Sequence, residues 1–416
     1  MEQHDLARRT LLKAGAAVGL AGLASVTVAG PAAAFGDPGG ADEVLLWLDQ
    51  PDPIPPGAVD IVAHLLKWEA LDSWRTPNGE FFTVKHYNLP SLTAGSWRLD
   101  IDGLVEHPVS LSLAALRARP RREVDFTLEC SGNHGLPFSI GAIGNANWAG
   151  TPLADVLRRA RPRPNGVEVV FWGADQGAVT IRDDSGITGA GLTGTTTPDD
   201  TGGLDLTITE QFARSMTLAD AMSPDNLLCY EMNGVALPPG HGYPLRLIAP
   251  GWYGVANVKW LSRIEVRDGR YAGRFMARDY VTIREEQDAG RTVWTFTNVS
   301  HARLKSAPAK VTRRGKHYVV HGAAWGAPIS SVEVQIDGGS WRRAQLHRQR
   351  PLGGNGFSWA FWTWDWGTPA AGEHTVRSRA FDRQNQLQPP PEDPYLASRR
   401  TYWENNGQVT RRVLIP

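Results

Sequence analysis

The sequence predicts an α+β protein in which a mixed α/β domain is followed by an all-β sandwich of immunoglobulin-like type. A chain of 416 residues is long enough for two or three domains with separate cores. Its 44 glycines and 29 prolines favour strands and loops over a helical bundle. From about Lys305 onward, short alternating strands are separated by turns such as 337–339.

The overall charge argues against a nucleic-acid partner. Lys and Arg total 43 and Asp and Glu also total 43, so the formal net charge is zero. A surface that binds nucleic acid, or that steers a charged ligand over a distance, needs an excess of one sign.

The first residues predict a targeting segment. Arg8 and Arg9 precede a weakly hydrophobic run of Ala and Gly over 14–30, and an Ala-x-Ala cleavage site follows near Ala34. A membrane anchor is the less favoured interpretation, because a span needs about 20 strongly apolar residues. We therefore expect a twin-arginine signal peptide over 1–34, with a mature protein that is exported already folded to the periplasm or the cell exterior.

The next residues predict a domain in which strands and short helices alternate. Ser112 is a plausible N-cap for the first helix. The expected strands are 81–89, 97–103, 167–172 and 227–232, and the expected helices are 112–119, 152–161 and 218–222. Residues 183–206 are nearly all Asp, Ser, Gly and Thr, which indicates either a lid or, as we favour, a disordered surface loop.

Cys130 follows an apolar strand and opens a turn of Ser, Gly and Asn. A thiol at such a turn can serve as a ligand of a soft metal or as a nucleophile. Two other interpretations stay open, a buried small hydrophobe and a disulfide with Cys229 in the exported protein. Cys229 itself lies in the middle of an apolar strand, so we expect it to pack in the core.

Two later segments carry further polar candidates. His241, Arg246 and Lys259 lie on or beside glycine-rich turns, where backbone N–H groups can approach a phosphate, and together they predict an anion site. Tyr280 follows Asp279, and a tyrosine there can donate a hydrogen bond to an oxygen of a substrate or of a metal centre. A half-buried structural tyrosine is the alternative.

The aromatic residues near the C-terminus change parity within one strand. Phe357, Trp359 and Phe361 share one face, whereas Trp362, Trp364 and Trp366 share the other. A sandwich core explains so dense an aromatic strip more simply than the alternative, an interface. This switch predicts a β-bulge or a strand that is buried on both sides.

Taken together, these motifs resemble the sulfite oxidase family of molybdopterin oxidoreductases, from about residue 76 to the end of the chain. The motifs follow the family's order: Cys-x-Gly-Asn at 130–133, Gly-Ala-Ile to Trp-x-Gly at 141–150, His-Gly-x-Pro-x-Arg at 241–246, Asn-Val-Lys-Trp at 257–260 and Arg-Asp-Tyr at 278–280.

The resemblance implies roles for individual residues. Cys130 would be the protein ligand of molybdenum and would also take part in catalysis, together with Tyr280 and Asp279. The residues implied to bind the pterin cofactor are His86, Lys85, Asp175, His241, Arg246, Asn257, Val258 and Lys259. It further implies a molybdopterin domain over 35–304 and an Ig-like dimerisation domain over 305–416.

By the same resemblance, the chain would carry molybdenum with molybdopterin and no haem. It would catalyse two-electron oxo transfer at a cysteine-ligated molybdenum and pass electrons to a separate acceptor such as a cytochrome c. We expect a homodimer formed through the C-terminal domain, a small-molecule substrate, and no membrane span in the mature chain.

The sequence departs from the family where sulfite-oxidising members place arginines. Val84 stands at the first arginine position with Lys85 beside it, Gly135 stands at the second, and 403–407 offers no clear third. Phe138 replaces a tryptophan of the family. Each lost charge-assisted hydrogen bond is worth about 1.5–3 kcal/mol, so we expect a substrate less anionic than sulfite.

Other functions compete with this one. Within the same class the alternatives are a sulfite dehydrogenase and a reductase of sulfoxides or N-oxides. In a different class, the chain would be a non-catalytic binding protein on the same scaffold.

Overall fold

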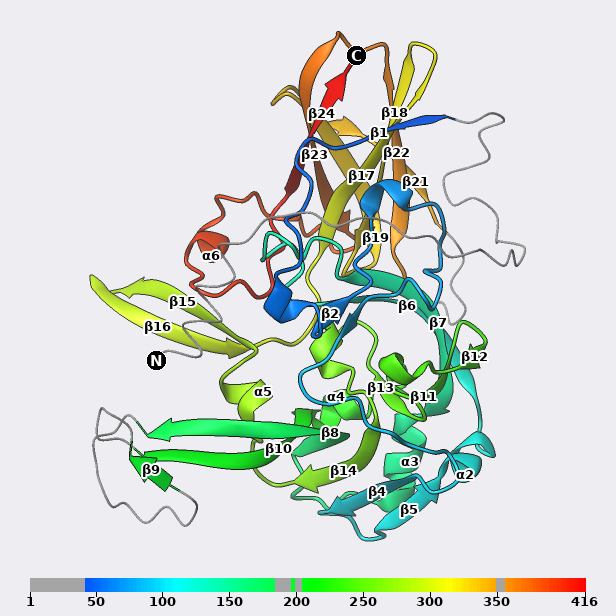
Figure 1. The fold of residues 1–416 in the computed structure, drawn as a ribbon, viewed down its shortest axis with the longest axis vertical. Coiled ribbons are helices and arrows are strands. Elements are labelled where there is room, and N and C mark those ends of the chain that lie inside the picture. The colour runs from blue at the N-terminus through cyan, green and yellow to red at the C-terminus, as the bar shows by residue number, and fades with distance from the viewer. Residues whose placement is uncertain (1–41, 184–195, 199–203, 349–355) are drawn as a thin grey trace.

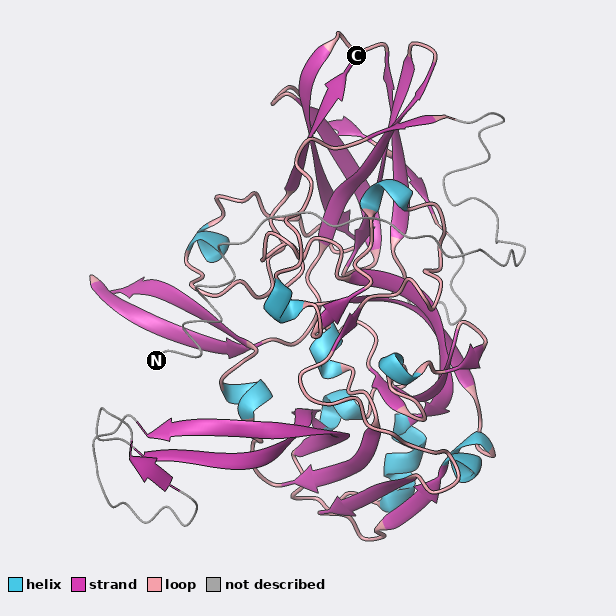
Figure 2. Ribbon diagram, in the orientation of Figure 1, coloured by secondary structure: helices cyan, strands magenta, loops and turns pink. Residues whose placement is uncertain are grey.

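The computed structural model describes residues 42–183, 196–198, 204–348 and 356–416. The expected signal peptide at 1–34 and most of the predicted 183–206 loop lie outside these residues. Strands dominate the fold, and helices are short (Figure 2). In Figure 1 a β-sandwich that carries the C-terminus lies above a mixed α/β part, which confirms the predicted fold class.

The mixed part is built on two sheets. The first has the order β5-β4-β14-β8-β10-β9, and the second has the order β12-β11-β7-β6 with β13 paired to β11. The strands of the first sheet are β4 (Arg98–Gly103), β5 (Val109–Ser112), β8 (Glu168–Asp183), β9 (Thr196–Pro198), β10 (Leu204–Thr217) and β14 (Leu261–Arg267). Those of the second are β6 (Arg122–Glu129), β7 (Ile143–Pro152), β11 (Leu227–Met232), β12 (Val235–Ala236) and β13 (Arg246–Ile248).

Short helices, a small strand pair and a hairpin complete this part. The helices are α2 (Leu113–Arg117), α3 (Leu153–Ala160), α4 (Leu218–Ala221) and α5 (Arg274–Ala277), with 3₁₀ turns η1 (Pro56–Ala58), η2 (Trp68–Ala70), η3 (Pro239–His241) and η4 (Gly254–Ala256). The strand pair is β2 (Val62–Ala63) with β3 (Thr83–Val84), and the hairpin is β15 (Val281–Asp288) with β16 (Arg291–Asn298).

Local sequence explains where several elements begin and end. The Ser112 hydroxyl accepts a hydrogen bond from the backbone N–H of Ala115 at 3.1 Å, which confirms the predicted N-cap. Thr217 caps α4 in the same way. The strand expected over 81–89 is much shorter, because only Thr83 and Val84 form ladder bonds, to β2.

The larger core lies between the first sheet and its helices. Leu153 and Leu157 on one face of α3 pack with Phe171 on β8 and Ile264 on β14. Cys229 is fully buried in a second cluster around Phe126, so its predicted packing role is confirmed. Cys130 and Cys229 are both free thiols, and the disulfide interpretation is therefore wrong.

The sandwich pairs two sheets of the orders β1-β17-β18-β22-β21 and β20-β19-β23-β24. Its elements are β1 (Glu43–Leu45), β17 (Lys305–Arg314), β18 (His317–Trp325), β19 (Ile329–Ile336), β20 (Arg342–Arg343), β21 (Gln345–His347), β22 (Ala360–Gly367), β23 (Gly372–Asp382), α6 (Pro394–Ala397) and β24 (Val409–Ile415). The early strand β1 thus joins the edge of the C-terminal sandwich.

The aromatic strand of the sandwich is buried on both sides, as its parity switch predicts. Trp362 packs in the sandwich core, whereas Trp359 and Phe361 pack with Trp68 and Trp325 at the junction with the mixed part. The ladder between β18 and β22 is continuous through Phe361 and Trp362, and its register shift lies further along, at 365–367, so no bulge marks the parity switch. In the part of the chain that the structure describes, no helix combines the length and apolar character needed to cross a membrane.

The contact between Trp362 and Gly322 generates a first prediction. A Cβ on Gly322 would lie 2.1 Å from the Trp362 ring and 2.5 Å from the Ala307 carbonyl oxygen. Because both neighbours are buried, Gly322→Ala is expected to lower the free energy of unfolding by about 1–3 kcal/mol in a denaturant titration.

Gly95→Ala is the matched control, since no atom lies within 4 Å of the new Cβ. Equal stability of Gly322→Ala and wild type would contradict this account of the sandwich core.

Candidate active site

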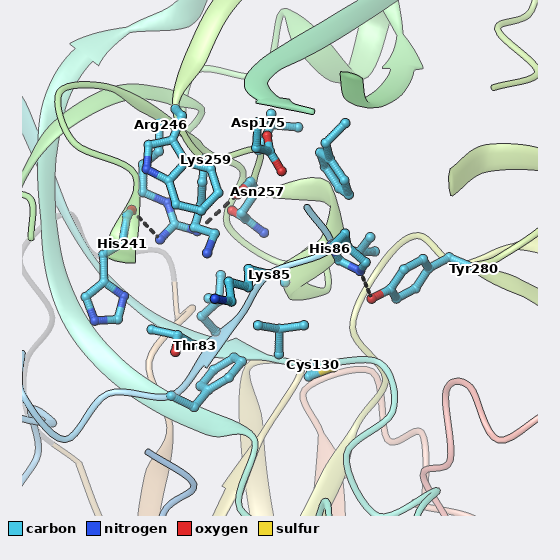
Figure 3. A pocket seen from close by; sticks show the side chains of 18 residues that line it. Thr83, Lys85, His86, Cys130, Asp175, His241, Arg246, Asn257, Lys259 and Tyr280 are labelled. Atoms are coloured by element: carbon cyan, nitrogen blue, oxygen red, sulfur yellow. Dashed lines mark hydrogen bonds between the residues drawn. The ribbon is translucent and has the colours of Figure 1, made fainter. Parts of the chain in front are cut away.

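The mixed part contains a pocket of about 610 Å³, counted with its opening to solvent, and Figure 3 shows the side chains that line it. It is formed where β3, the end of β6, the start of β13 and the turn η4 converge. Its lining residues are Phe82, Thr83, Val84, Lys85, His86, Leu128, Cys130, Asp175, Phe212, His241, Arg246, Gly254, Val255, Asn257, Val258, Lys259, Trp260 and Tyr280.

The structure brings together all but one of the residues singled out in the sequence. Those that line the pocket are Lys85, His86, Cys130, Asp175, His241, Arg246, Asn257, Val258, Lys259 and Tyr280. Asp279 does not line it. Its carboxylate is instead bound by Arg274 at 2.5 Å and Arg278 at 3.2 Å, so Asp279 braces the segment before Tyr280 from outside.

One end of the pocket presents the Cys130 thiol (Figure 3). The Cys130 N–H donates to the Ala142 carbonyl at 2.9 Å, and the Cys130 carbonyl accepts from Asn133 N–H at 2.9 Å, so the turn is closed on both sides. Burial raises the pKa of the Cys130 thiol to about 11. The thiol therefore stays protonated at neutral pH until a metal or a base takes the proton.

His86 and Tyr280 lie beside this thiol and share a hydrogen bond of 2.6 Å between His86 Nε2 and Tyr280 Oη. Burial, followed by the charge of Lys259, lowers the pKa of His86 to about 3. Burial, followed by the charge of a Cys130 thiolate, raises the pKa of Tyr280 well above its ordinary value. Both side chains are therefore neutral at pH 7, and their shared hydrogen bond lies in the lining of the pocket.

A residue that the motifs did not indicate supports Tyr280 from behind. The Trp403 ring stacks on the Tyr280 ring with centroids 4.3 Å apart. Trp403 lies 123 residues further along the chain, in a loop without periodicity, so no local pattern could place it there.

The opposite end of the pocket is cationic (Figure 3). The Arg246 guanidinium donates to the backbone carbonyls of His241 at 3.1 Å and Asn257 at 3.0 Å, while its Nε has no partner among the described residues. The Lys259 ammonium donates to the Gly240 carbonyl at 3.0 Å. The two cations thereby tie the turns of η3 and η4 together around a space with little negative charge.

The pKa values of this end are shifted mainly by burial, and for Lys259 also by the neighbouring Arg246. Burial and the neighbouring Arg246 lower the pKa of Lys259 to about 7, and burial lowers that of Arg246 to about 10. Asp175 is the single acid in the lining, and burial raises its pKa to about 6. A bound anion would offset the cost of burying these cations, so this end is suited to a phosphate.

The C-terminal segment covers the turn of Cys130 where an arginine was expected. A Cβ on Gly135 would lie 2.0 Å from the backbone oxygen of Tyr402. Glu404 N–H donates to the Ser131 carbonyl at 2.7 Å, and the Asn405 amide donates to the His134 carbonyl at 2.7 Å. No side chain fits at Gly135 unless this segment moves.

Arg214 is a second residue that sequence reasoning missed. It lies on β10 with 1% of its surface exposed, and its guanidinium donates to the backbone carbonyls of Phe275 and Val299. An arginine within the apolar stretch 212–216 was the available signal. Its contacts hold α5 and the chain after β16 against the pocket.

The geometry therefore combines two functions in one pocket. The Cys130 thiol, a soft sulfur donor, and a neutral tyrosine–histidine pair face one end, and an anion-binding group of cations faces the other. Such a pocket fits an anionic cofactor that carries a soft metal.

Comparison with known proteins points to the same combination. A family model described as "Oxidoreductase molybdopterin binding domain" matches residues 86–275, and one described as "Mo-co oxidoreductase dimerisation domain" matches residues 293–405. The chain is 32% identical over 341 residues to sulfite oxidase of Gallus gallus, a match that covers 76% of this chain and 68% of that protein.

Two further relatives differ in how much of them is matched. Mitochondrial sulfite oxidase of Rattus norvegicus is 30% identical over 344 residues, and the match covers 76% of this chain but 58% of the rat protein. The chain thus spans less than two thirds of that relative. A structure titled as the sulfane dehydrogenase SoxCD from Paracoccus pantotrophus superposes with a TM-score of 0.68 at 25% identity, covering 90% of both chains.

The lowered pKa of Lys259 generates a prediction for the cofactor-free protein. Between about pH 7 and pH 8.5 the folded chain has lost this proton while the unfolded chain retains it. The unfolded state then binds more protons, so the free energy of unfolding rises with pH, at up to about 1.4 kcal/mol per pH unit.

Chemical denaturation of wild type and Lys259→Met across this range measures the effect. The variant is expected to lose the rising slope, and the same slope in both proteins would contradict the lowered pKa of the buried Lys259.

Proposed function

This chain belongs to the sulfite oxidase family of molybdopterin-dependent oxidoreductases, and we propose that it oxidises a small substrate less anionic than sulfite. It is a molybdenum-dependent enzyme whose cofactor is molybdenum with molybdopterin. The observation that carries the proposal is the single pocket in which the Cys130 thiol and Tyr280 face one end while Arg246 and Lys259 face the other.

In this proposal different residues of the pocket bind different parts of the cofactor. Cys130 provides a thiolate to the molybdenum, and Arg246, Lys259 and His241 hold the phosphate of the pterin. The remaining cofactor contacts come from Lys85, His86, Asp175, Asn257 and Val258. The bound cofactor supplies two-electron oxo transfer.

The side chains around the thiol then orient the substrate. Tyr280 stays protonated and lies within hydrogen-bond distance of His86, so its hydroxyl is held at the pocket edge and can bond an oxygen of the substrate. Phe212 stacks on the His86 ring at 5.0 Å and fixes its orientation. Asp279 contributes indirectly through Arg274.

The identity of the substrate is inferred from the missing arginines. Val84 lines the pocket where one arginine was expected, and Tyr402 occupies the space that a side chain at Gly135 would need. A substrate with two negative charges would lose charge-assisted hydrogen bonds there. The second candidate substrate is a compound with a sulfane sulfur group. It is suggested by the name of the Paracoccus structure, which matches over 90% of both chains.

The partners and the location of the enzyme are also part of the proposal. We infer a homodimer formed through the C-terminal domain, which the dimerisation family model supports. Electrons would pass to a separate acceptor such as a cytochrome c. The twin arginines Arg8 and Arg9 support export of the folded, cofactor-loaded protein.

Molybdenum analysis tests the cysteine assignment. Protein from a host that makes the cofactor is expected to contain about one molybdenum per chain, and Cys130→Ala is expected to lose most of it because a direct ligand is removed. Cys229→Ala is the control, since that cysteine is buried in the core. Full molybdenum content in Cys130→Ala would refute the ligand role.

Steady-state kinetics with sulfite and ferricyanide test the substrate assignment. Wild type is expected to oxidise sulfite poorly. Val84→Arg is expected to lower the KM for sulfite by about 10–100-fold, the equivalent of one charge-assisted hydrogen bond of about 1.5–3 kcal/mol. Val84→Met, which is of similar length without the charge, should leave the KM unchanged.

Efficient sulfite oxidation by wild type, or an equal response of the Arg and Met variants, would rule out the proposed charge-based exclusion of sulfite.

A further inference from the structure

A fully buried ion pair joins the C-terminal sandwich to the residue beside Cys130. Lys305 Nζ lies 2.6 Å from Glu129 Oε1, and the two side chains are 1% and 0% exposed. Glu129 ends β6 and Lys305 begins β17, so the pair connects two parts of the fold that are 176 residues apart in the chain.

The same carboxylate oxygen also shapes the turn that carries the thiol. Glu129 Oε1 accepts a second hydrogen bond from the Asn133 amide at 2.8 Å, and Asn133 Oδ1 accepts from Ala142 N–H at 3.2 Å. Asn133 N–H in turn donates to the Cys130 carbonyl at 2.9 Å. Lys305 is thus linked to the turn of Cys130 by hydrogen bonds through Glu129 Oε1 and the Asn133 side chain.

Only one oxygen of the Glu129 carboxylate takes part in these hydrogen bonds. Glu129 Oε2 is buried and has no hydrogen-bond partner among the described residues. If Lys305 is lost, the carboxylate keeps only the Asn133 bond and is free to rotate toward other donors. Any such rotation moves Asn133 and therefore the turn.

Stability alone does not account for a charged pair at this position. An apolar pair of similar volume holds buried surfaces together as well as an ion pair does, because two charges must be desolvated to form the latter. The junction already contains apolar contacts, among them Trp68 with Trp325 and Trp74 with Phe361. What the ion pair adds is a fixed direction for the Glu129 side chain.

We propose that Lys305 and Glu129 are positioning residues for Cys130, so that the sandwich, besides its role in dimerisation, completes the metal site. This rests on the proposed function, in which the Cys130 thiolate binds molybdenum. Groups that hold a metal ligand from behind typically change metal affinity by about 10–100-fold when they are removed.

A set of variants separates positioning from stability. Lys305→Met leaves Glu129 buried and unpaired, so it lowers both the thermal midpoint and the molybdenum content. The double variant Glu129→Gln/Lys305→Met removes both charges but keeps a side-chain oxygen at position 129 that can still accept from Asn133. It is expected to regain most of the thermal midpoint, while its molybdenum content at limiting molybdate stays about tenfold below wild type.

The cofactor-free full-length proteins give a second readout that does not depend on catalysis. The rate at which iodoacetamide alkylates Cys130, followed by mass spectrometry, reports the placement of the thiol. This rate is expected to differ from wild type in both Lys305 variants, whereas Cys229 is expected to stay unreactive because it is fully buried.

Arg75→Met is the matched control, because it also breaks an ion pair to a buried acid on β6. If the double variant does not fold, the comparison of Arg75→Met with Lys305→Met still separates positioning from stability. Arg75 pairs with Asp125 at 2.9 Å on the same strand β6, four residues before Glu129, and the Asp125 side chain is 3% exposed. Its loss is expected to lower the thermal midpoint while the molybdenum content and the alkylation rate of Cys130 stay at wild-type values.

Wild-type molybdenum content and alkylation rate in a stable double variant would overturn the proposal. A loss of molybdenum in Arg75→Met equal to that in Lys305→Met would do the same. If Cys130→Ala keeps its molybdenum, the proposed ligand role fails first. If Cys130 is required but the double variant behaves as wild type, only the positioning role fails.

Discussion

The buried contact between the Lys305 ammonium and the Glu129 carboxylate is the constraint on which the arrangement of this molecule depends. It fixes the end of β6, where the thiol is presented, against the start of β17, where the sandwich begins. The hydrogen bond from Glu404 N–H to the Ser131 carbonyl and the packing of Tyr402 on Gly135 extend this contact along the same turn. The sandwich thereby supports the turn that carries Cys130, while the residues that line the pocket all come from the mixed part.

Electrostatics divide the pocket into two regions with different tasks. At the cationic end, Arg246 and Lys259 are buried close together with one acid in the lining, and the lowered pKa of Lys259 expresses the cost of that arrangement. A phosphate bound there would offset this cost. At the thiol end, burial keeps Tyr280 and His86 neutral, so the substrate meets hydrogen-bonding groups without net charge. We propose that this contrast lets one pocket bind an anionic cofactor and still disfavour an anionic substrate.

Local motifs predicted much of the fold and most of the pocket, because their chemistry depends on short segments. The turn at Cys130, the glycine turns of His241 and Lys259 and the cap at Ser112 are such cases. Contacts between distant segments were not predictable, since no local pattern encodes the stacking of Trp403 on Tyr280 or the pairing of Lys305 with Glu129. Asp279 was expected in the site because it precedes Tyr280. Its carboxylate instead pairs with Arg274 and Arg278 and does not line the pocket.

X-ray absorption at the molybdenum edge tests the central claim most directly, because it counts the sulfur atoms bound to the metal. If Cys130 is the protein ligand, the loaded wild-type enzyme should show one sulfur more than the molybdenum that remains in Cys130→Ser, where an oxygen replaces it. An unchanged number of sulfur ligands in Cys130→Ser would contradict the account, because the thiol at the end of β6 would then not bind the metal.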